Sequence, residues 1–173
     1  MVLLIAAAMM LAPGPGRTQP PVQDLKAQML FNIAKFVEWP ARPRAAERQL
    51  TFVILGEDEL AGVMVALLST KSIHGREVFV RCVRRVEDVK DADVLFIASS
   101  EQRRIPEVLE AVRGHSVLTV ADMSGFAAMG GMVELVQMDD KVRFEINPTS
   151  ADLARLKISA KLLALAKIVA QAE

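Results

Sequence analysis

Cysteine and histidine are scarce in this sequence, and their scarcity removes two kinds of site. Cys82 is the only cysteine among 173 residues, so no disulfide can form within the chain. Together with His74 and His115 it supplies too few ligands for a structural zinc site. We expect Cys82 to be a small apolar residue buried in a strand, with pairing between two chains as the alternative.

A surplus of charge of either sign is also missing, because 21 basic side chains balance 21 acidic ones. Phosphate binding needs a basic surplus, so nucleic acid is not expected as the main partner. Apolar residues make up 52% of the chain, which is enough for the core of one domain. The composition is therefore that of an ordinary globular domain.

No apolar run is long enough to span a bilayer, which takes about 20 residues. The unbroken apolar run over 1–12 fits the hydrophobic region of a secretory signal peptide, and an uncleaved membrane anchor is the alternative. Residues 13–23 are rich in Pro and Gly and are typical of a flexible linker. We therefore expect an exported protein whose single domain covers residues 24–173.

The common catalytic and cofactor-binding motifs are absent too. Gly56 and Gly62 are spaced too widely for a dinucleotide-binding loop, and there is no Walker loop. Gly56 and Ser99 stand where a phosphorylated receiver domain would need acidic residues. No Gly-x-Ser-x-Gly nucleophile elbow surrounds the serines. The sequence therefore predicts a protein without catalytic activity, cofactor or metal.

What the chain does contain is a regular alternation of strands and helices. Apolar, β-branched runs over 50–55 and 94–98 predict strands buried on both faces, and further strands are expected over 76–83 and 116–120. Helical patterns fall between them. This alternation predicts a mostly parallel sheet of about six strands with helices on both faces, a three-layer α/β/α sandwich.

The two ends of the domain complete this prediction. An amphipathic helix is expected from Leu25 to the stop at Pro40, with Leu25, Met29, Ile33 and Val37 facing the core. Strands over 132–137 and 141–146 should form a β-hairpin that adds an antiparallel edge. Ser150 is expected to cap one final helix, which starts near residue 151 and buries residues such as Leu153 and Leu165.

Ligands of open α/β sheets bind beyond the carboxyl ends of the strands. Here those ends carry four small or acidic residues, which form the candidate ligand site: Gly56, Ser99, Ser100 and Asp122. The alternative is that the two serines only cap the helix that follows them.

Segments spread along the chain resemble the YfiR-like family. The matching segments are 26–27, 31–40, 54–56, 94–97, 124–126, 130–132, 142–147 and 156–163. Of these, Phe31-Asn-Ile-Ala-Lys-Phe-Val-Glu-Trp-Pro40 and Val142-Arg-Phe-Glu-Ile-Asn147 are the longest. The resemblance covers nearly everything after residue 24.

The resemblance implies a dimeric periplasmic regulator without enzymatic activity. YfiR-like proteins bind the periplasmic sensor domain of an inner-membrane diguanylate cyclase and hold it inactive. An outer-membrane lipoprotein can remove them, which raises cyclic di-GMP and promotes biofilm formation. Related domains also occur beside other sensors, including histidine kinases. Some relatives respond to redox state through disulfides, but an internal disulfide cannot form in this chain, because Cys82 is its only cysteine.

We hypothesise that the C-terminal hairpin contributes to the partner site. If Val142, Phe144 and Ile146 pack inward, the alternation of a strand leaves Arg143 and Glu145 exposed. Two further candidates are expected nearby, Phe126 and Glu134. An ordinary hairpin surface is the alternative. A periplasmic module that binds a small ligand at the strand ends is the second functional hypothesis.

Overall fold

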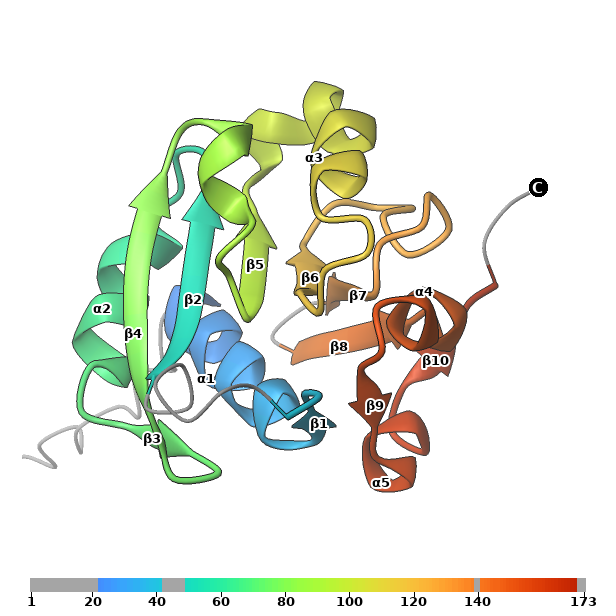
Figure 1. Cartoon of the computed structure of the whole chain (residues 1–173), viewed down its shortest axis with the longest axis horizontal. Helices are drawn as coiled ribbons and strands as arrows, with labels where there is room; N and C mark the ends of the chain where they lie inside the picture. Colours follow the sequence, from blue (N-terminus) through green and yellow to red (C-terminus); the bar gives the residue numbers. More distant parts are fainter. Residues whose placement is uncertain (1–21, 42–48, 139–140, 171–173) are drawn as a thin grey trace, which may run out of the picture.

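The main sheet has eight strands in the computed structural model, which describes residues 22–41, 49–138 and 141–170. In chain order the strands are β2 (Gln49–Leu55), β3 (Ser72–Ile73), β4 (Arg76–Val83), β5 (Val94–Ile97), β6 (Leu118–Ala121), β7 (Val133–Met138), β8 (Lys141–Ile146) and β10 (Lys167–Ile168). They lie side by side in the order β10-β8-β7-β6-β5-β2-β4-β3 (Figure 1). The sequence predicted about six strands because β3 and β10, two residues each, are too short to show a pattern.

Five of these strands form a parallel core in the order β4-β2-β5-β6-β7. Counted along the chain this is the 2-1-3-4-5 order of flavodoxin-like doubly wound sheets. β8 runs antiparallel to β7, which confirms the predicted hairpin. The hairpin is not the edge of the sheet, however, because β10 pairs in parallel with β8.

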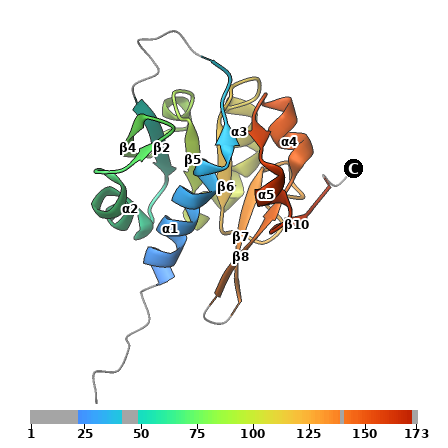
Figure 2. The same ribbon diagram turned by 90° about the horizontal axis from the view of Figure 1, so that it is seen from below.

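Helices cover both faces of the sheet, which confirms the predicted three-layer arrangement (Figure 2). α1 (Val22–Lys35) and α2 (Leu60–Leu68) pack on one face, and η2 (Val86–Val89) and α3 (Ile105–Ala111) pack on the other. Alternate residues of β2 serve the two cores. Phe52 and Ile54 face α1 and α2, whereas Val53 and Leu55 face η2 and α3.

α1 is amphipathic as predicted, but its position and its buried face both differ from the prediction. It ends at Lys35 rather than near Pro40, because β1 (Val37–Glu38) leaves the helix and pairs antiparallel with β9 (Lys157–Ile158). Leu25 and Met29 are only half-buried. The fully buried residues of α1 are Ala27, Leu30, Ile33 and Ala34.

The predicted single C-terminal helix is wrong. The segment instead alternates α4 (Pro148–Leu153), β9, α5 (Ala160–Leu163) and β10. Asn147 rather than Ser150 caps α4, since its side chain accepts the Ser150 N–H at 3.1 Å. Arg155 then takes a left-handed φ of 60°, and β9 pairs with β1. Leu153 and Leu165 are consequently 73% and 75% exposed instead of buried.

Cys82 is exposed, which corrects the prediction that it is buried. β4 is the outermost long strand on its side of the sheet, and β3 pairs only with Arg76 and Glu77. The second half of β4, which contains Cys82, therefore has β2 as its only neighbour among the described residues, although the apolar alternation of the strand continues there. Burial at Cys82 would need a second covering element at that point.

A buried carboxylate connects the amino ends of several strands. Asp93 is 1% exposed, and its Oδ2 accepts the Thr51 N–H at 2.8 Å and Nη2 of Arg76 at 2.9 Å. The backbone carbonyl of Asp93 accepts the Leu118 N–H at 2.8 Å and the indole N–H of Trp39 at 3.2 Å. One residue thus joins β2, β4, β6 and the segment after β1.

Candidate functional site

A buried carboxylate also shapes the loop over 122–131, between β6 and β7. Glu134 on β7 is 5% exposed. Its Oε1 accepts the Gly125 N–H at 3.1 Å, and its Oε2 accepts the Ala127 N–H at 3.2 Å. Gly125 has a φ of 82°, a left-handed conformation that glycine adopts without strain. Both carboxylate oxygens therefore hold the loop in one conformation.

Two further buried polar side chains attach this loop to its neighbours. Asn147 is 0% exposed, and its Nδ2 donates to the carbonyl of Ala127 at 2.9 Å while its Oδ1 caps α4. Thr119 on β6 accepts the Met132 N–H on its Oγ1 at 3.1 Å. The loop, β6 and the start of α4 are consequently fixed relative to one another.

Gly131 packs directly against the ring of Phe126 at the end of the loop. A Cβ atom at Gly131 would lie 2.2 Å from Cε1 of Phe126, far closer than any real contact. Phe126 itself is 0% exposed. Only glycine fits here, so this position helps to set the course of the chain between the loop and β7.

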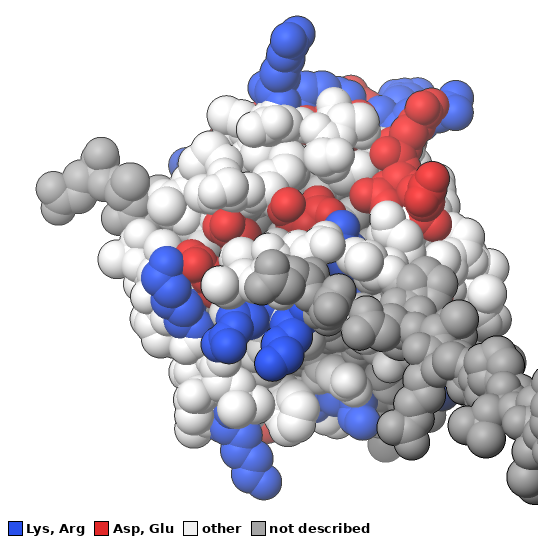
Figure 3. Space-filling view, turned by 180° about the vertical axis from the view of Figure 1, so that it is seen from behind, with Lys and Arg blue, Asp and Glu red and all other residues white. Residues whose placement is uncertain are grey.

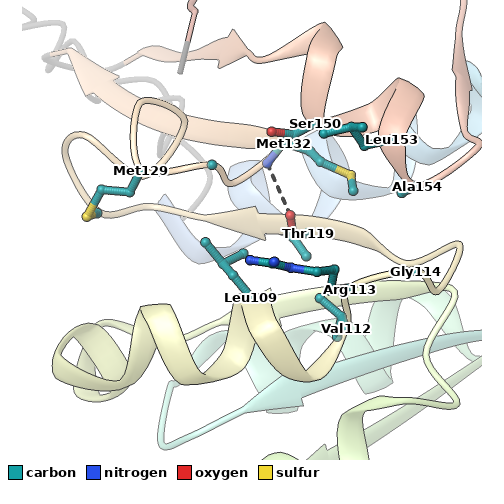
Figure 4. A pocket seen from close by; sticks show the side chains of 11 residues that line it. Leu109, Val112, Arg113, Gly114, Thr119, Met129, Met132, Ser150, Leu153 and Ala154 are labelled. Atoms are coloured by element: carbon teal, nitrogen blue, oxygen red, sulfur yellow. Dashed lines mark hydrogen bonds between the residues drawn. The ribbon is translucent and has the colours of Figure 1, made fainter. Parts of the chain in front are cut away.

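A pocket of about 560 Å³ lies between α3, this loop and α4 (Figure 4). Leu109 approaches from α3, Val112 and Arg113 approach from the turn that follows it, and Met132 and Leu153 lie on the opposite side (Figure 4). The remaining lining residues are Gly114, Thr119, Met129, Gly130, Ser150 and Ala154. Most of this lining is apolar, and its size falls in the range of about 300–1,000 Å³ that is usual for ligand pockets.

The rim of the pocket is exposed and largely apolar. Met129 is 47% exposed and also lines a second hollow of about 510 Å³ over α3, together with Leu109 and Pro106. The one charged residue of the lining is Arg113, whose guanidinium forms a solvent-exposed ion pair with Glu110 at 2.7 Å. This arrangement suits an apolar side chain or an apolar segment of a partner. It brings no nucleophile and base together.

Three residues of the predicted strand-end site, Gly56, Ser99 and Ser100, lie at the switch point between β2 and β5. Ser100, in η3 (Ser99–Arg104), accepts the Glu57 N–H on its Oγ at 3.2 Å. A Cβ atom at Gly56 would lie 2.6 Å from that Oγ, so the two residues do come together. The alternative that the serines cap the following helix is wrong, since η3 begins without a side-chain cap.

Asp122 joins a different contact at the end of β6. Its Oδ2 forms an ion pair with Nζ of Lys26 on α1, and the two side chains are only 14% and 13% exposed. Ligand binding by Gly56, Ser99, Ser100 and Asp122 stays a prediction.

Of the predicted partner residues, Arg143 is exposed, Glu145 is half-buried, and Phe126 and Glu134 are buried. The prediction that Glu145 is exposed is wrong, because β10 pairs with β8 at this residue. Arg143 is exposed and lines a hollow of about 380 Å³ between β8 and α1. Glu145 accepts a hydrogen bond from Lys167 Nζ at 2.8 Å, and this bond raises the pKa of Lys167 above its usual 10.5. Phe126 and Glu134 are buried, so they shape the loop rather than the surface. Partner binding by all four stays a prediction.

The pocket itself was not predicted from the sequence. Its walls come from four separate segments of the chain. From the sequence, its two exposed apolar residues, Met129 and Leu153, were expected to lie in a loop and in the core. The one sequence feature that could have pointed to it is the pair Gly130-Gly131 beside Met129, because paired glycines mark a tightly turned loop.

On the face seen from behind (Figure 3), the described charged side chains do not gather into one large patch. From behind, basic and acidic side chains form small separate groups with uncharged surface between them (Figure 3). Within the described part of the chain, no three His, Cys, Asp or Glu side chains are grouped to hold a metal ion. No helix among residues 22–41, 49–138 and 141–170 is long and apolar enough to cross a membrane.

The strand order and the pocket together define a doubly wound α/β domain of the flavodoxin-like kind, with an apolar pocket beside its second helical layer. The chain belongs to the YfiR/HmsC-like family, whose model matches residues 23–167. This is a family of periplasmic, regulatory proteins.

A solved structure of a conserved domain protein from Vibrio cholerae O1 biovar El Tor has a similar fold, with a TM-score of 0.58 at 11% sequence identity. The similarity covers 84% of this chain and 59% of the Vibrio chain. At this identity the similarity supports the fold alone.

Proposed function

We propose that this protein is a non-enzymatic periplasmic regulator that binds the periplasmic domain of an inner-membrane diguanylate cyclase and holds that enzyme inactive. The observation that carries the proposal is the family match over residues 23–167, which spans nearly the whole described chain. Removal of the regulator, for which an outer-membrane lipoprotein is the candidate agent, would raise cyclic di-GMP and promote biofilm formation.

The apolar rim of the α3–α4 pocket supports a protein partner. Met129 and Leu153 are exposed side chains on a surface with little charge, and such patches favour protein contacts. Methionine adapts its shape to different apolar surfaces. Arg143 and Glu145 on β8 are the second candidate surface, where a charged rim would steer association more than it would add affinity.

Binding between the purified protein and the cyclase periplasmic domain, measured by titration calorimetry, tests the proposal. We expect Leu153→Asp to weaken binding at least tenfold, because it places a charge on the apolar rim. Leu165→Asp is the matched control, since Leu165 is equally exposed but lies outside the pocket. Equal affinity for both variants would remove the pocket from the interface. Charge reversal at Glu145 tests the β8 surface in the same way.

Cellular cyclic di-GMP tests the regulatory step itself. Deleting the gene should raise cyclic di-GMP, and restoring the wild-type gene should lower it again. Restoring Leu153→Asp at equal protein abundance should leave the level high. A deletion strain with unchanged cyclic di-GMP would contradict repression of a diguanylate cyclase, whatever the purified proteins bind.

A sensory module for a small apolar ligand is the second candidate, favoured by the size and apolar lining of the pocket. Methyl-labelled methionines give the test, because Met129 and Met132 both line the pocket. Toluene and benzoate serve as a neutral and an anionic probe. Saturable shifts confined to these two methyl signals would support the candidate, and uniform small shifts would count against it.

A further inference from the structure

Two buried hydroxyl groups line the otherwise apolar pocket between α3 and α4 (Figure 4). Ser150 on α4 is 8% exposed, and Thr119 on β6 is 1% exposed. The backbone N–H of Ser150 donates to the Asn147 side chain, but its Oγ forms no hydrogen bond with any described residue. Buried polar side chains are normally hydrogen-bonded. The Ser150 hydroxyl is therefore available to a molecule that enters the pocket.

The polar groups of the lining are suited to donating hydrogen bonds. Oγ1 of Thr119 accepts the Met132 N–H at 3.1 Å, and no described group accepts a hydrogen bond from this hydroxyl in return. Each hydroxyl carries one O–H donor, and the guanidinium of Arg113 can only donate. A ligand that brings acceptor oxygens would therefore find donors on both sides of the pocket.

The charges around the pocket favour an anion. The lining contains Arg113 and no acidic residue. Arg155 adds a second guanidinium beside the wall, because its Nη2 donates to the carbonyl of Gly114 at 3.2 Å. Arg113 does pair with Glu110, but Glu110 is not part of this lining. An anionic ligand would thus lie near two guanidinium groups, whereas a cationic ligand would find no carboxylate within the pocket.

The apolar part of the lining is entirely aliphatic, since no aromatic side chain belongs to it. Its members are Leu109, Val112, Met129, Met132, Leu153 and Ala154. Such a lining offers no ring for an aromatic ligand to stack on. Methionine side chains are flexible and fill irregular gaps. The pocket therefore suits an alkyl chain better than a flat ring.

We propose that this pocket binds an aliphatic carboxylate. The carboxylate accepts hydrogen bonds from the hydroxyls of Ser150 and Thr119, and the alkyl chain lies against the leucine and methionine side chains. Hydrogen bonds to an ionised acceptor are roughly twice as strong as neutral ones, so a carboxylate uses these donors better than an alcohol does. The inference rests on the second candidate function, the sensory module, and gives its ligand a chemical class. It does not depend on repression of a cyclase.

Titration of octanoate into the protein with methyl-labelled methionines tests the proposal. We expect saturable shifts of the Met129 and Met132 signals, because both side chains line the pocket. Octylammonium has the same chain with the opposite charge and should bind roughly tenfold more weakly or worse. Benzoate has the same head group on an aromatic ring, and toluene lacks the head group. Both should also bind more weakly than octanoate.

Two variants locate the head group. Ser150→Ala should weaken octanoate binding by roughly threefold to tenfold, the scale of one hydrogen bond. It removes a hydroxyl that bonds to no described residue, so thermal unfolding should be unchanged. Ser69→Ala is the matched control, since Ser69 is exposed at the end of α2 and outside the pocket. Arg113→Gln should weaken the binding of octanoate but not that of octylammonium.

The possible failures can be told apart. If octylammonium, benzoate or toluene binds as tightly as octanoate, the proposed ligand class is wrong and the second candidate function still stands. The proposal is also overturned if Ser150→Ala and Arg113→Gln both bind octanoate like the wild type. If octanoate, benzoate and toluene all give no saturable shift, the proposal and the second candidate function fail together.

Discussion

Single buried polar residues hold much of this structure in place, and Asp93 is the clearest case. Replacing it with Ala leaves Arg76, whose side chain is only 15% exposed, without its carboxylate. Breaking a buried ion pair in this way costs about 3–5 kcal/mol. We expect urea unfolding of Asp93→Ala to show a loss of that size. The exposed Asp91→Ala is the control, and equal stability of the two variants would contradict the role given to Asp93.

Two glycines make a matched pair of predictions with opposite signs. Gly131→Ala forces a Cβ into the ring of Phe126 and should cost about 1–3 kcal/mol or more, as overpacked cores do. Gly62→Ala adds a Cβ that meets nothing within 4 Å, in the middle of α2. It should stabilise the protein by about 0.5–1 kcal/mol through helix propensity. Thermal unfolding of both variants decides this, and the same sign for both would be inconsistent with the structure.

At the scale of elements, the C-terminal strand β10 is one of the two weakly attached ends of the sheet, as is β3 at the other end. β10 has two residues and one neighbour, and the Glu145–Lys167 ion pair lies across that contact. Glu145 raises the pKa of Lys167, so the stabilisation is complete below the unfolded value of 10.5 and is lost as pH rises through the folded value.

Carbon NMR of the lysine side chains tests this directly. The titration midpoint of Lys167 should lie above 10.5 in the wild type and return towards 10.5 in Glu145→Gln. The exposed Glu77→Gln, on the far side of the sheet, should leave the midpoint unchanged. If the titration midpoint of Lys167 is the same in the wild type and in Glu145→Gln, the ion pair is not formed in solution.

The central elements could be predicted from the sequence because their cause is local. β2 and β5 are buried on both faces, and a continuous apolar run is the direct result of that burial. The C-terminal segment could not be predicted in this way. Leu153 and Leu165 fit a helical apolar pattern, but β9 pairs with β1, more than a hundred residues earlier, and this non-local pairing divides the helix.

In the candidate sites too, features with a local cause could be predicted and those that depend on non-local contacts could not. Gly56 and Ser100 could be expected together, because parallel strands end at the same edge of a sheet. The α3–α4 pocket depends on a loop whose shape is set by hydrogen bonds from Glu134 and Asn147. An acidic residue within a strand is usually expected on the surface, so the sequence placed Glu134 in a partner contact instead.

At the scale of the whole molecule, stability should decrease from the centre of the sheet to its ends. β2 and β5 each have a parallel neighbour on both sides and face two cores, whereas β10 has neither advantage. We expect native-state hydrogen exchange to protect β2 amides at least about a thousandfold more than that of Ile168. Equal protection across the sheet would show that the molecule opens only as a single unit.

The contact between Trp39 and Asp93 has a practical consequence for watching this protein fold. Trp39 is the only tryptophan in a chain without tyrosine, and its indole N–H reaches the carbonyl of Asp93. Nearly all the light that the chain emits on ultraviolet excitation therefore comes from the place where the segment after β1 docks on the sheet. A rapid-mixing experiment that follows this emission measures the rate of that docking step, and it gives no signal for parts of the molecule that fold far from Trp39.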